Sequence, residues 1–275
     1  MDYNINALEK LASGYTADVF IIDDTKVLKL YNEGWNIKDI QNEFEVGKAM
    51  ESYGISAPKV YDLVTCKNRH GIVFQRLENH TLMHKLLSQP ASWKKQSRRM
   101  AFVHAQLNQI HDERYVLKDQ KTFYKQMILS RTSIDETIKK QLLDKLAALP
   151  DGCSICHGDF HPMNLLFHKE QLYIIDWLGA LRGNPLADVA GSYLIMQVMG
   201  VDAIGTNHSF LRTRIQNWAI HRFAAYYLQT YLSITHTDKK DIDEWIAIRA
   251  ATYLDVGLSN QANQKLLSYL HTYLN

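Results

Sequence analysis

The sequence predicts an α+β protein with a small N-terminal lobe, rich in β-strands and containing one helix, and a larger, mainly helical C-terminal lobe. Two observations predict this order. The first 80 residues contain short apolar runs separated by turn residues, which is typical of antiparallel hairpins. From about residue 81 the apolar residues follow a helical spacing, interrupted by one central hairpin. We therefore expect one lobe over residues 1–78 and a second over residues 79–275.

Two hairpins are predicted in the N-terminal lobe. The first pairs the apolar runs at residues 19–22 and 26–31, which flank the turn residues Asp23-Asp24-Thr25. The second pairs residues 59–64 with 71–75, which a polar stretch separates. These runs predict a small antiparallel sheet in which Lys29 lies on a central strand.

The helices are predicted from apolar stripes at helical spacing. In the N-terminal lobe such a stripe covers residues 36–53, and Gly54 supplies a stop signal. In the C-terminal lobe one stripe runs from Met100 to Ile110. A second runs from Ile138 to Leu149, with Ser133-Ile134-Asp135-Glu136 as its capping box. After Pro185 four more helices are expected, near residues 188–199, 209–232, 241–257 and 260–273.

Composition and charge exclude several classes of partner. With 31 Lys+Arg against 29 Asp+Glu, the net charge of +2 gives no field that would favour nucleic acid or an anionic membrane. No apolar run approaches the roughly 18 residues of a membrane helix. The first ten residues lack the basic and apolar regions of a signal peptide, and three cysteines form no disulfide framework. These features predict a cytoplasmic protein, and they leave the oligomeric state open.

The densest polar cluster covers residues 157–164, directly before the predicted central hairpin of residues 164–168 and 172–176. Within it, Asp159 is followed five positions later by Asn164, and Asp176 comes at the end of the hairpin. Oxygen ligands such as those of Asn164 and Asp176 suit Mg²⁺ bound to nucleotide phosphates, and Asp159 is left free to accept a hydroxyl proton. This spacing is typical of the catalytic loop and metal ligands of kinase-like folds.

The motifs HGDFHPMN at residues 157–164 and IIDW at 174–177 resemble those of the aminoglycoside phosphotransferase and choline-kinase-like family. That family has a His-Gly-Asp loop that ends in Asn, followed by Ile-Asp-Trp or Ile-Asp-Phe. The resemblance spans roughly residues 10 to 195. It implies a bilobal protein-kinase-like fold and transfer of the γ-phosphoryl group of ATP or GTP, with Mg²⁺, to a hydroxyl of a small molecule.

The resemblance also implies roles in nucleotide binding. Lys29 would contact the α- and β-phosphates, with Glu43 as its ion-pair partner, although Glu45 is an alternative partner. Asp188 would brace the catalytic loop by bonding its backbone, or would be an ordinary carboxylate at a helix N-terminus.

The expected phosphate loop departs from the family pattern, because residues 11–18 hold a single glycine instead of a glycine-rich run. Family members often have such reduced loops, in which backbone N–H groups and hydroxyls cover the phosphates. By this resemblance Ser13, Gly14 and Thr16 would contact the phosphates. The backbone of residues 75–78, including Gln75 and Leu77, would form the adenine-binding hinge.

A small molecule is a better acceptor than a protein for this chain. Only eleven residues separate Asp176 from Asp188 and no Ala-Pro-Glu element follows, so the long segment on which protein kinases lay a peptide is missing. An aminoglycoside, choline or an amino sugar would be typical acceptors in the family. Acidic residues of the C-terminal part could attract a cationic acceptor or could form solvated helix faces and caps: Asp238, Asp241, Asp243, Glu244 and Asp255.

Other interpretations of the same residues remain open at this point. Cys153-Ser154-Ile155-Cys156-His157 matches the pattern of covalent haem attachment, and with His161 it offers four zinc ligands. His157, Asp159, His161 and Asp176 could instead hold the metal of a hydrolase, although Lys29 and Asn164 would then have no role. A non-catalytic nucleotide-binding module with the same fold is a further alternative.

Overall fold

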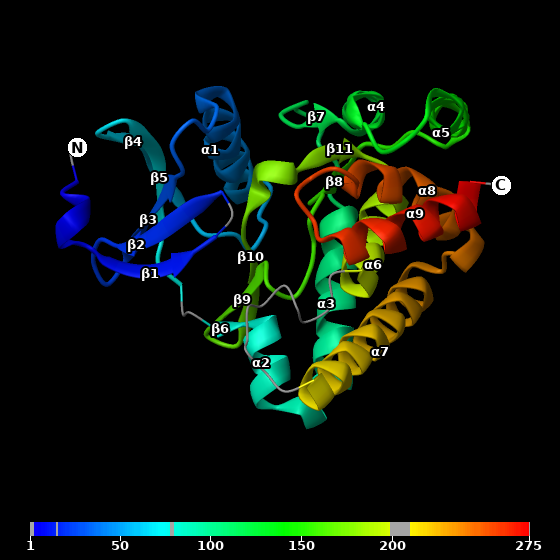
Figure 1. Ribbon diagram of the computed structural model, residues 1–275. Helices are drawn as coiled ribbons and strands as arrows, with labels where there is room; N and C mark the ends of the chain where they lie inside the picture. The colour runs from blue at the N-terminus through cyan, green and yellow to red at the C-terminus, as the bar shows by residue number, and fades with distance from the viewer. Residues whose placement is uncertain (1–2, 15, 78–79, 199–209, 275) are drawn as a thin grey trace. The chain divides into compact units, whose positions relative to one another are not determined.

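The computed structural model describes residues 3–14, 16–77, 80–198 and 210–274 (Figure 1). It contains two compact units. The first comprises Met1–Lys85 together with Met163–Gly179, and the second comprises Leu86–Pro162 together with Ala180–Asn275. The first unit is built on an antiparallel sheet, and the second is mainly helical. The predicted α+β class is therefore confirmed.

A five-stranded antiparallel sheet forms the centre of the first unit, in the order β1-β2-β3-β5-β4 (Figure 1). Its strands are β1 (Glu9–Ser13), β2 (Ala17–Ile21), β3 (Lys26–Tyr31), β4 (Val60–Cys66) and β5 (Arg69–Gln75). Lys29 on the central strand β3 lies opposite Val19 of β2 and Ile72 of β5. Both predicted hairpins are confirmed.

The side chains of β3 alternate between the two faces of this sheet, as the period of a strand requires. Leu28 and Leu30 are buried on one face, with Val73 of β5. Tyr31 is buried on the other face, where it packs with Ile40 of helix α1. Because Lys29 and Tyr31 are two positions apart, their side chains leave β3 on this same face.

Helix α1 (Ile37–Ser52) begins and ends where the sequence predicts. The side chain of Asn36 accepts a hydrogen bond of 3.0 Å from the backbone N–H of Lys38, which caps the helix. Gly54 follows the helix with a φ of 71°, a conformation that glycine adopts without steric cost. Gly47 brings α1 close to β4, because a Cβ at this position would lie 2.5 Å from Cγ2 of Val60.

A second, three-stranded sheet of the first unit contains the predicted central hairpin. Strands β9 (Leu165–His168) and β10 (Gln171–Ile174) pair through the tight turn at Lys169 and Glu170, which have φ values of 47° and 63°. Strand β6 (His80–Thr81) adds to β9, and helix α2 (Leu82–Ser88) follows it. The backbone N–H of Ile174 donates to the carbonyl of Ser56 at 2.8 Å, which ties β10 to the segment after α1.

Helices make up most of the second unit, where α3 packs on α7, and α8 packs on both α6 and α9 (Figure 1). A small sheet in the order β7-β11-β8 lies beside them. The helices are α3 (Trp93–Asn108), α4 (Gln120–Ser130), α5 (Glu136–Ala148), α6 (Pro185–Val198), α7 (Phe210–Thr235), α8 (Lys239–Tyr253) and α9 (Asn260–Leu274). The strands are β7 (Lys118–Asp119), β8 (Ser154–Cys156) and β11 (Leu181–Gly183). Short 3₁₀ turns cover Ile5–Ala7, Pro90–Ser92 and Trp177–Gly179.

Some element boundaries differ from the prediction for physical reasons. Helix α5 is capped by Asp135, which accepts from the N–H of Ile138 at 2.9 Å, and the predicted capping by Ser133 is wrong. Helix α6 begins at Pro185 instead of residue 188, because proline is well tolerated in the first turn of a helix. In the described part of the chain, no helix has the length and apolar character needed to cross a membrane.

Candidate functional site

The first unit holds a lysine between two carboxylates. Nζ of Lys29 donates to Oε1 of Glu43 at 2.7 Å and to Oδ1 of Asp176 at 2.8 Å. The side chains of Lys29 and Glu43 are 14% and 2% exposed, whereas Asp176 is 38% exposed. Burial alone would lower the pKa of Lys29, but the charges of Glu43 and Asp176 outweigh it and raise that pKa well above its usual value. Lys29 is therefore a fixed cation.

Glu43 is held by two donors. Its second carboxylate oxygen accepts from the hydroxyl of Tyr31, which reaches it from the same face of β3 as Lys29. Burial raises the pKa of Glu43 above its usual value, against the opposing effect of Lys29. Of the two glutamates considered from the sequence, Glu43 contacts Lys29, whereas Glu45 is exposed on the other side of α1.

Asn164 and Asp176 lie at the two ends of the β9–β10 hairpin. The carbonyl of Asn164 accepts from the N–H of Ile175 at 3.0 Å, so the hairpin ends are joined next to both residues. Asn164 is buried, and Asp176 adopts a left-handed φ of 65°, which aspartate tolerates better than most residues. This turn follows the last strand residue, Ile174, and directs the Asp176 carboxylate to Lys29.

The predicted phosphate loop joins β1 to β2. The N–H of Gly14 donates to the carbonyl of Ala17 at 2.8 Å, and the carbonyl of Thr16 accepts from the N–H of Asn32 at 2.9 Å. The hydroxyl of Ser13 donates to Asp18 at 2.8 Å. The structure thus places Ser13 at the end of β1, and Gly14 and Thr16 between β1 and β2.

The predicted hinge follows β5. Gln75 donates its backbone N–H to the carbonyl of Lys59 at 2.8 Å, and Arg76 donates to the carbonyl of Thr25 at 2.8 Å. Leu77 is buried. Glu78 lies outside the described residues, as does the predicted lobe boundary between residues 78 and 79.

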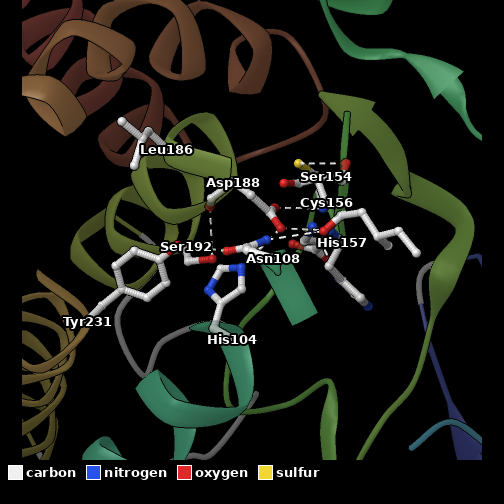
Figure 2. A network of polar contacts seen from close by, with 12 residues as sticks. His104, Asn108, Ser154, Cys156, His157, Leu186, Asp188, Ser192 and Tyr231 are labelled. Carbon is white, nitrogen blue, oxygen red and sulfur yellow. Dashed lines mark hydrogen bonds and ion pairs between the residues drawn. The ribbon is translucent and has the colours of Figure 1, made fainter. Parts of the chain in front are cut away.

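The second unit holds the loop that begins at His157. Asp188, at the start of α6, accepts from the backbone N–H of His157 at 2.6 Å and from that of Gly158 at 2.8 Å (Figure 2). The predicted bracing role of Asp188 is therefore confirmed. Burial would raise the pKa of Asp188, but hydrogen bonding to His104 and the nearby His157 outweigh it and lower that pKa to about 2.

His104 of α3 supports Asp188 from the other side. Its Nε2 lies 3.0 Å from Oδ2 of Asp188 (Figure 2). Its Nδ1 lies 2.6 Å from the hydroxyl of Tyr227. The imidazole also stacks on Phe160, with ring centroids 4.0 Å apart. Two helices, α3 and α7, therefore fix the loop through buried polar groups and an aromatic contact.

Asp159 carries the exposed carboxylate of this loop. Its side chain is 41% exposed, and its Oδ2 lies 3.3 Å from Nε2 of His161. Its backbone N–H donates to Nδ1 of His157 at 3.3 Å. Partial burial among the surrounding groups would raise the pKa of Asp159, but the nearby His161, His157 and Arg249 outweigh this effect and hold that pKa well below its usual range. Asp159 is ionised at neutral pH.

The metal-centre and haem interpretations of Cys153 and Cys156 find no support in the geometry. Both cysteines are free, and Sγ of Cys156 faces the carbonyls of Ser154 and Asn184 in a fully buried environment. Burial raises the pKa of the Cys156 thiol well above its usual value. Among the described residues, no three or more His, Cys, Asp or Glu side chains are grouped to hold a metal ion.

The acidic residues considered for a cationic acceptor are engaged elsewhere. Asp243 and Glu244 pair with Lys239 and Lys145 at 2.6 and 2.7 Å. Asp255 accepts from the backbone N–H groups of Thr132 and Ser133 at 2.7 and 2.9 Å. Asp238 lies 3.7 Å from Lys240, and Asp241 lies in the first turn of α8. Asp243 and Glu244 thus form surface ion pairs and Asp255 holds the backbone of residues 132–133, whereas Asp238 precedes α8 without a side-chain capping bond.

Three residues of the site were missed from the sequence: Tyr31, His104 and Arg249. Tyr31 lies two positions after Lys29, so the strand period alone indicates a shared face. Arg249 interrupts the apolar run Trp245-Ile246-Ala247-Ile248 before Ala250-Ala251, and an arginine in such a run signals a buried, paired charge. His104 carries no comparable signal, because a histidine on an apolar helix face is usually a core residue.

The chain was compared with protein families, with curated proteins and with solved structures. The family model described as the phosphotransferase enzyme family matches residues 7–238. Acyl-CoA dehydrogenase family member 10 from Mus musculus is 28% identical over 179 residues, or 56% of this chain. The match covers 16% of that protein, so the chain corresponds to a small part of this curated relative.

Solved structures share the fold at low sequence identity. Aminoglycoside-3'-phosphotransferase of type VIII is 15% identical with a TM-score of 0.63, and the match covers 89% of this chain and 92% of that chain. The amicoumacin kinase hAmiN, in complex with AMP-PNP, Ca²⁺ and Ami, is also 15% identical with a TM-score of 0.63. That match covers 99% of this chain and 89% of the other. The predicted kinase-like fold is thus confirmed.

Proposed function

Since the chain belongs to the phosphotransferase enzyme family, we propose that it moves the γ-phosphoryl group of ATP or GTP to a hydroxyl group of a small molecule. We assign nucleotide binding to residues 1–78, and catalysis and acceptor binding to residues 79–275. The observation that carries this proposal is the buried cation Lys29, held by Glu43 and Asp176 within hydrogen-bond distance.

In this proposal Lys29 binds the α- and β-phosphates of the nucleotide. A cation in a partly buried site interacts with phosphate more strongly than one in water, because little solvent screens it. Glu43 keeps the ammonium in place and would not contact the nucleotide itself. Ser13, Gly14 and Thr16 would cover the phosphates, and the backbone at Gln75 and Leu77 would meet the base.

Asn164 and Asp176 would hold Mg²⁺. Both supply oxygen donors, which Mg²⁺ prefers, and two protein ligands are enough when phosphate oxygens and water complete the shell. The 38% exposure of the Asp176 side chain is consistent with such a ligand. When bound, the ion neutralises charge on the phosphates.

Asp159 would orient the acceptor hydroxyl and take its proton. The hydroxyl oxygen forms a bond to the γ-phosphorus while the bond from that phosphorus to the β–γ bridging oxygen breaks. The nucleoside diphosphate leaves, and the hydroxyl proton goes to Asp159. Because the pKa of Asp159 is low, we expect its main contribution to be orientation, with proton transfer late in the reaction.

Transfer to a pool of acceptors tests this proposal. The protein is incubated with Mg²⁺, γ-labelled ATP or GTP, and aminoglycosides, choline, amino sugars and homoserine, and products are identified by mass. We expect one phosphorylated compound, formed by the wild type and not by the Asp159→Asn variant. Nucleotide binding without any product would instead favour the non-catalytic binding module and would contradict the proposal.

A further inference from the structure

Arg249 is a buried charge in the middle of α8, at 3% exposure. Its Nη2 donates to the carbonyl oxygen of Gly158 at 2.8 Å and to the hydroxyl of Tyr253 at 2.6 Å. Its Nη1 donates to the hydroxyl of Thr252 at 3.2 Å. Removing an arginine from water is costly, so a helix interior rarely keeps one without a specific partner. Outside α8, the partner is the backbone of the loop that carries Asp159.

The guanidinium of Arg249 packs against two aromatic rings and against α6, and among the described residues its Nε has no hydrogen-bond partner. The group lies over the rings of Tyr124 and Tyr253, 4.9 and 4.6 Å from their centroids. Gly191 of α6 leaves the necessary space, because a Cβ there would lie 2.5 Å from Nε and Nη2 of Arg249. Elements α4, α6 and α8 therefore fix this side chain, and their packing requires a glycine at position 191.

We propose that Arg249 is a positioning residue that sets the orientation of Asp159 by holding the carbonyl group of Gly158. This inference rests on the proposed function, in which Asp159 orients the acceptor hydroxyl. Arg249 would not contact the nucleotide or the acceptor.

The geometry of the loop explains why this contact matters. Gly158 has a φ of 81°, and glycine rotates more freely than any other residue. Asp188 fixes the N–H groups of His157 and Gly158, which lie before the peptide that joins Gly158 to Asp159. Arg249 fixes the oxygen of that next peptide. Without it, the peptide that leads into Asp159 keeps only two longer contacts, from its N–H to Nδ1 of His157 at 3.3 Å and from the hydroxyl of Tyr253 to its oxygen at 3.4 Å.

The direct test is replacement of Arg249 by Met, which keeps an apolar stem and removes the charge. We expect the turnover number of phosphoryl transfer to fall about 10- to 100-fold, since small displacements of a catalytic group have effects of this size. The KM for the nucleotide should change less than about threefold. The Arg249→Lys variant, which can still reach a carbonyl, should recover part of the loss.

Arg131→Met is the matched control. Arg131 is also buried, at 6% exposure, and its Nη2 donates to the backbone carbonyl of Thr252 at 2.8 Å, near the same end of α8. This variant loses an arginine–carbonyl bond at Thr252, whose hydroxyl Arg249 contacts, but it leaves the bond from Arg249 to the carbonyl of Gly158 in place. We expect a similar loss of stability and no loss of turnover number. Equal turnover in the two Met variants would overturn the proposal.

Gly191→Ala provides a variant that keeps every charge. The added methyl group must displace the guanidinium of Arg249, while alanine itself favours the helix. We expect a fall in turnover number in the same direction as in Arg249→Met, so this variant carries the test if Arg249→Met does not fold. A folded Gly191→Ala protein with unchanged turnover would contradict the proposal.

Hydrogen exchange separates this inference from the proposed function, because it needs no turnover. The amide of Asp159, which belongs to the peptide that Arg249 holds, should exchange at least tenfold faster in Arg249→Met than in Arg131→Met. If exchange is faster in Arg249→Met but the wild type transfers no phosphate, the role of Arg249 in positioning the loop stands and the proposed phosphotransferase function is rejected. If the two Met variants exchange at the same rate and the wild type does transfer phosphate, only the proposed role of Arg249 is rejected.

Discussion

At the scale of single residues, Glu43 shows how burial and pairing combine. Burial raises its pKa, and the contacts with Lys29 and Tyr31 use both of its oxygens. Because both of its oxygens are engaged, the Glu43 carboxylate has little conformational freedom, and it fixes the orientation of the Lys29 ammonium group. The charge of Glu43 therefore matters for phosphate binding even though Glu43 would not contact phosphate.

This predicts a contrast between two glutamates of the same helix. Glu43→Gln should weaken the affinity for Mg²⁺ and ATP about tenfold, equivalent to about 1.4 kcal/mol, because Lys29 loses its buried counter-charge. Glu45→Gln is the control, since Glu45 is exposed and two positions away. Isothermal titration calorimetry with Mg²⁺ and ATP measures both affinities. Equal affinities of the two variants would show that Glu43 has no role in nucleotide binding.

Asp159 gives a second prediction at this scale. Asp159→Asn keeps the shape of the side chain and removes the proton acceptor, so transfer should slow about 10²- to 10⁴-fold. Binding of Mg²⁺ and ATP should stay within about twofold, because Asp159 has no role there in the proposal. Parallel measurements of transfer and binding check this. A variant that transfers at the wild-type rate would exclude Asp159 as the acceptor-side carboxylate.

Asp188 predicts a dependence of stability on pH. Its folded-state pKa of about 2 lies below the ordinary value of 3.8. A depressed carboxylate pKa stabilises the fold above about pH 4, and this contribution is lost as the pH falls towards 2. Its size is about 2 kcal/mol, from the shift between the two pKa values.

The measurement is the free energy of unfolding of the wild type and of Asp188→Asn between about pH 6 and pH 2. The wild type should be more stable at the upper end, and the difference should shrink by about 2 kcal/mol across the range. A difference that does not vary with pH would mean that the hydrogen bonds to His157 and Gly158 do not depend on the charge of Asp188.

At the scale of elements, the sequence predicts best where periodicity and turn residues agree. Helix α1 and the hairpin β9–β10 have both signals and lie where expected. Strand β1 was not predicted, because four of its five residues are exposed and no apolar alternation marks it. Helix α4 was also missed, and its buried residues include the polar Gln120. Hydrophobic periodicity cannot identify such elements.

The contact between α1 and β4 predicts a coupling between two residues. Gly47→Ala places a methyl group against Val60, and overpacking of this kind costs about 1–3 kcal/mol, partly offset by about 1 kcal/mol of helix propensity. Val60→Ala alone leaves a cavity. Together the two changes should cost at least about 0.5 kcal/mol less than their sum. Urea unfolding of the three variants measures their free energies of unfolding. Strictly additive losses would show that α1 moves away from β4 to make room for the methyl group.

At the scale of the whole molecule, part of the candidate site is local in sequence and part of it is not. The spacing of Asp159, Asn164 and Asp176 is visible from the sequence alone. In the first unit, Tyr31 of β3 supports Glu43. In the second unit, the loop that carries Asp159 is supported by His104 of α3, through Asp188, and by Arg249 of α8. Spacing cannot reveal these supports, because only the fold brings residues more than 50 positions away against the loop of residues 157–162.

The central claim is that this chain transfers a γ-phosphoryl group with Asp159. The most direct test follows the loss of label from γ-labelled ATP with Mg²⁺ and pooled acceptors, for the wild type and Asp159→Asn side by side. We predict acceptor-dependent conversion of ATP to ADP by the wild type and at least about 100-fold slower conversion by the variant. Intact ATP in a wild-type sample that binds it, or equal rates for the two proteins, would contradict the account.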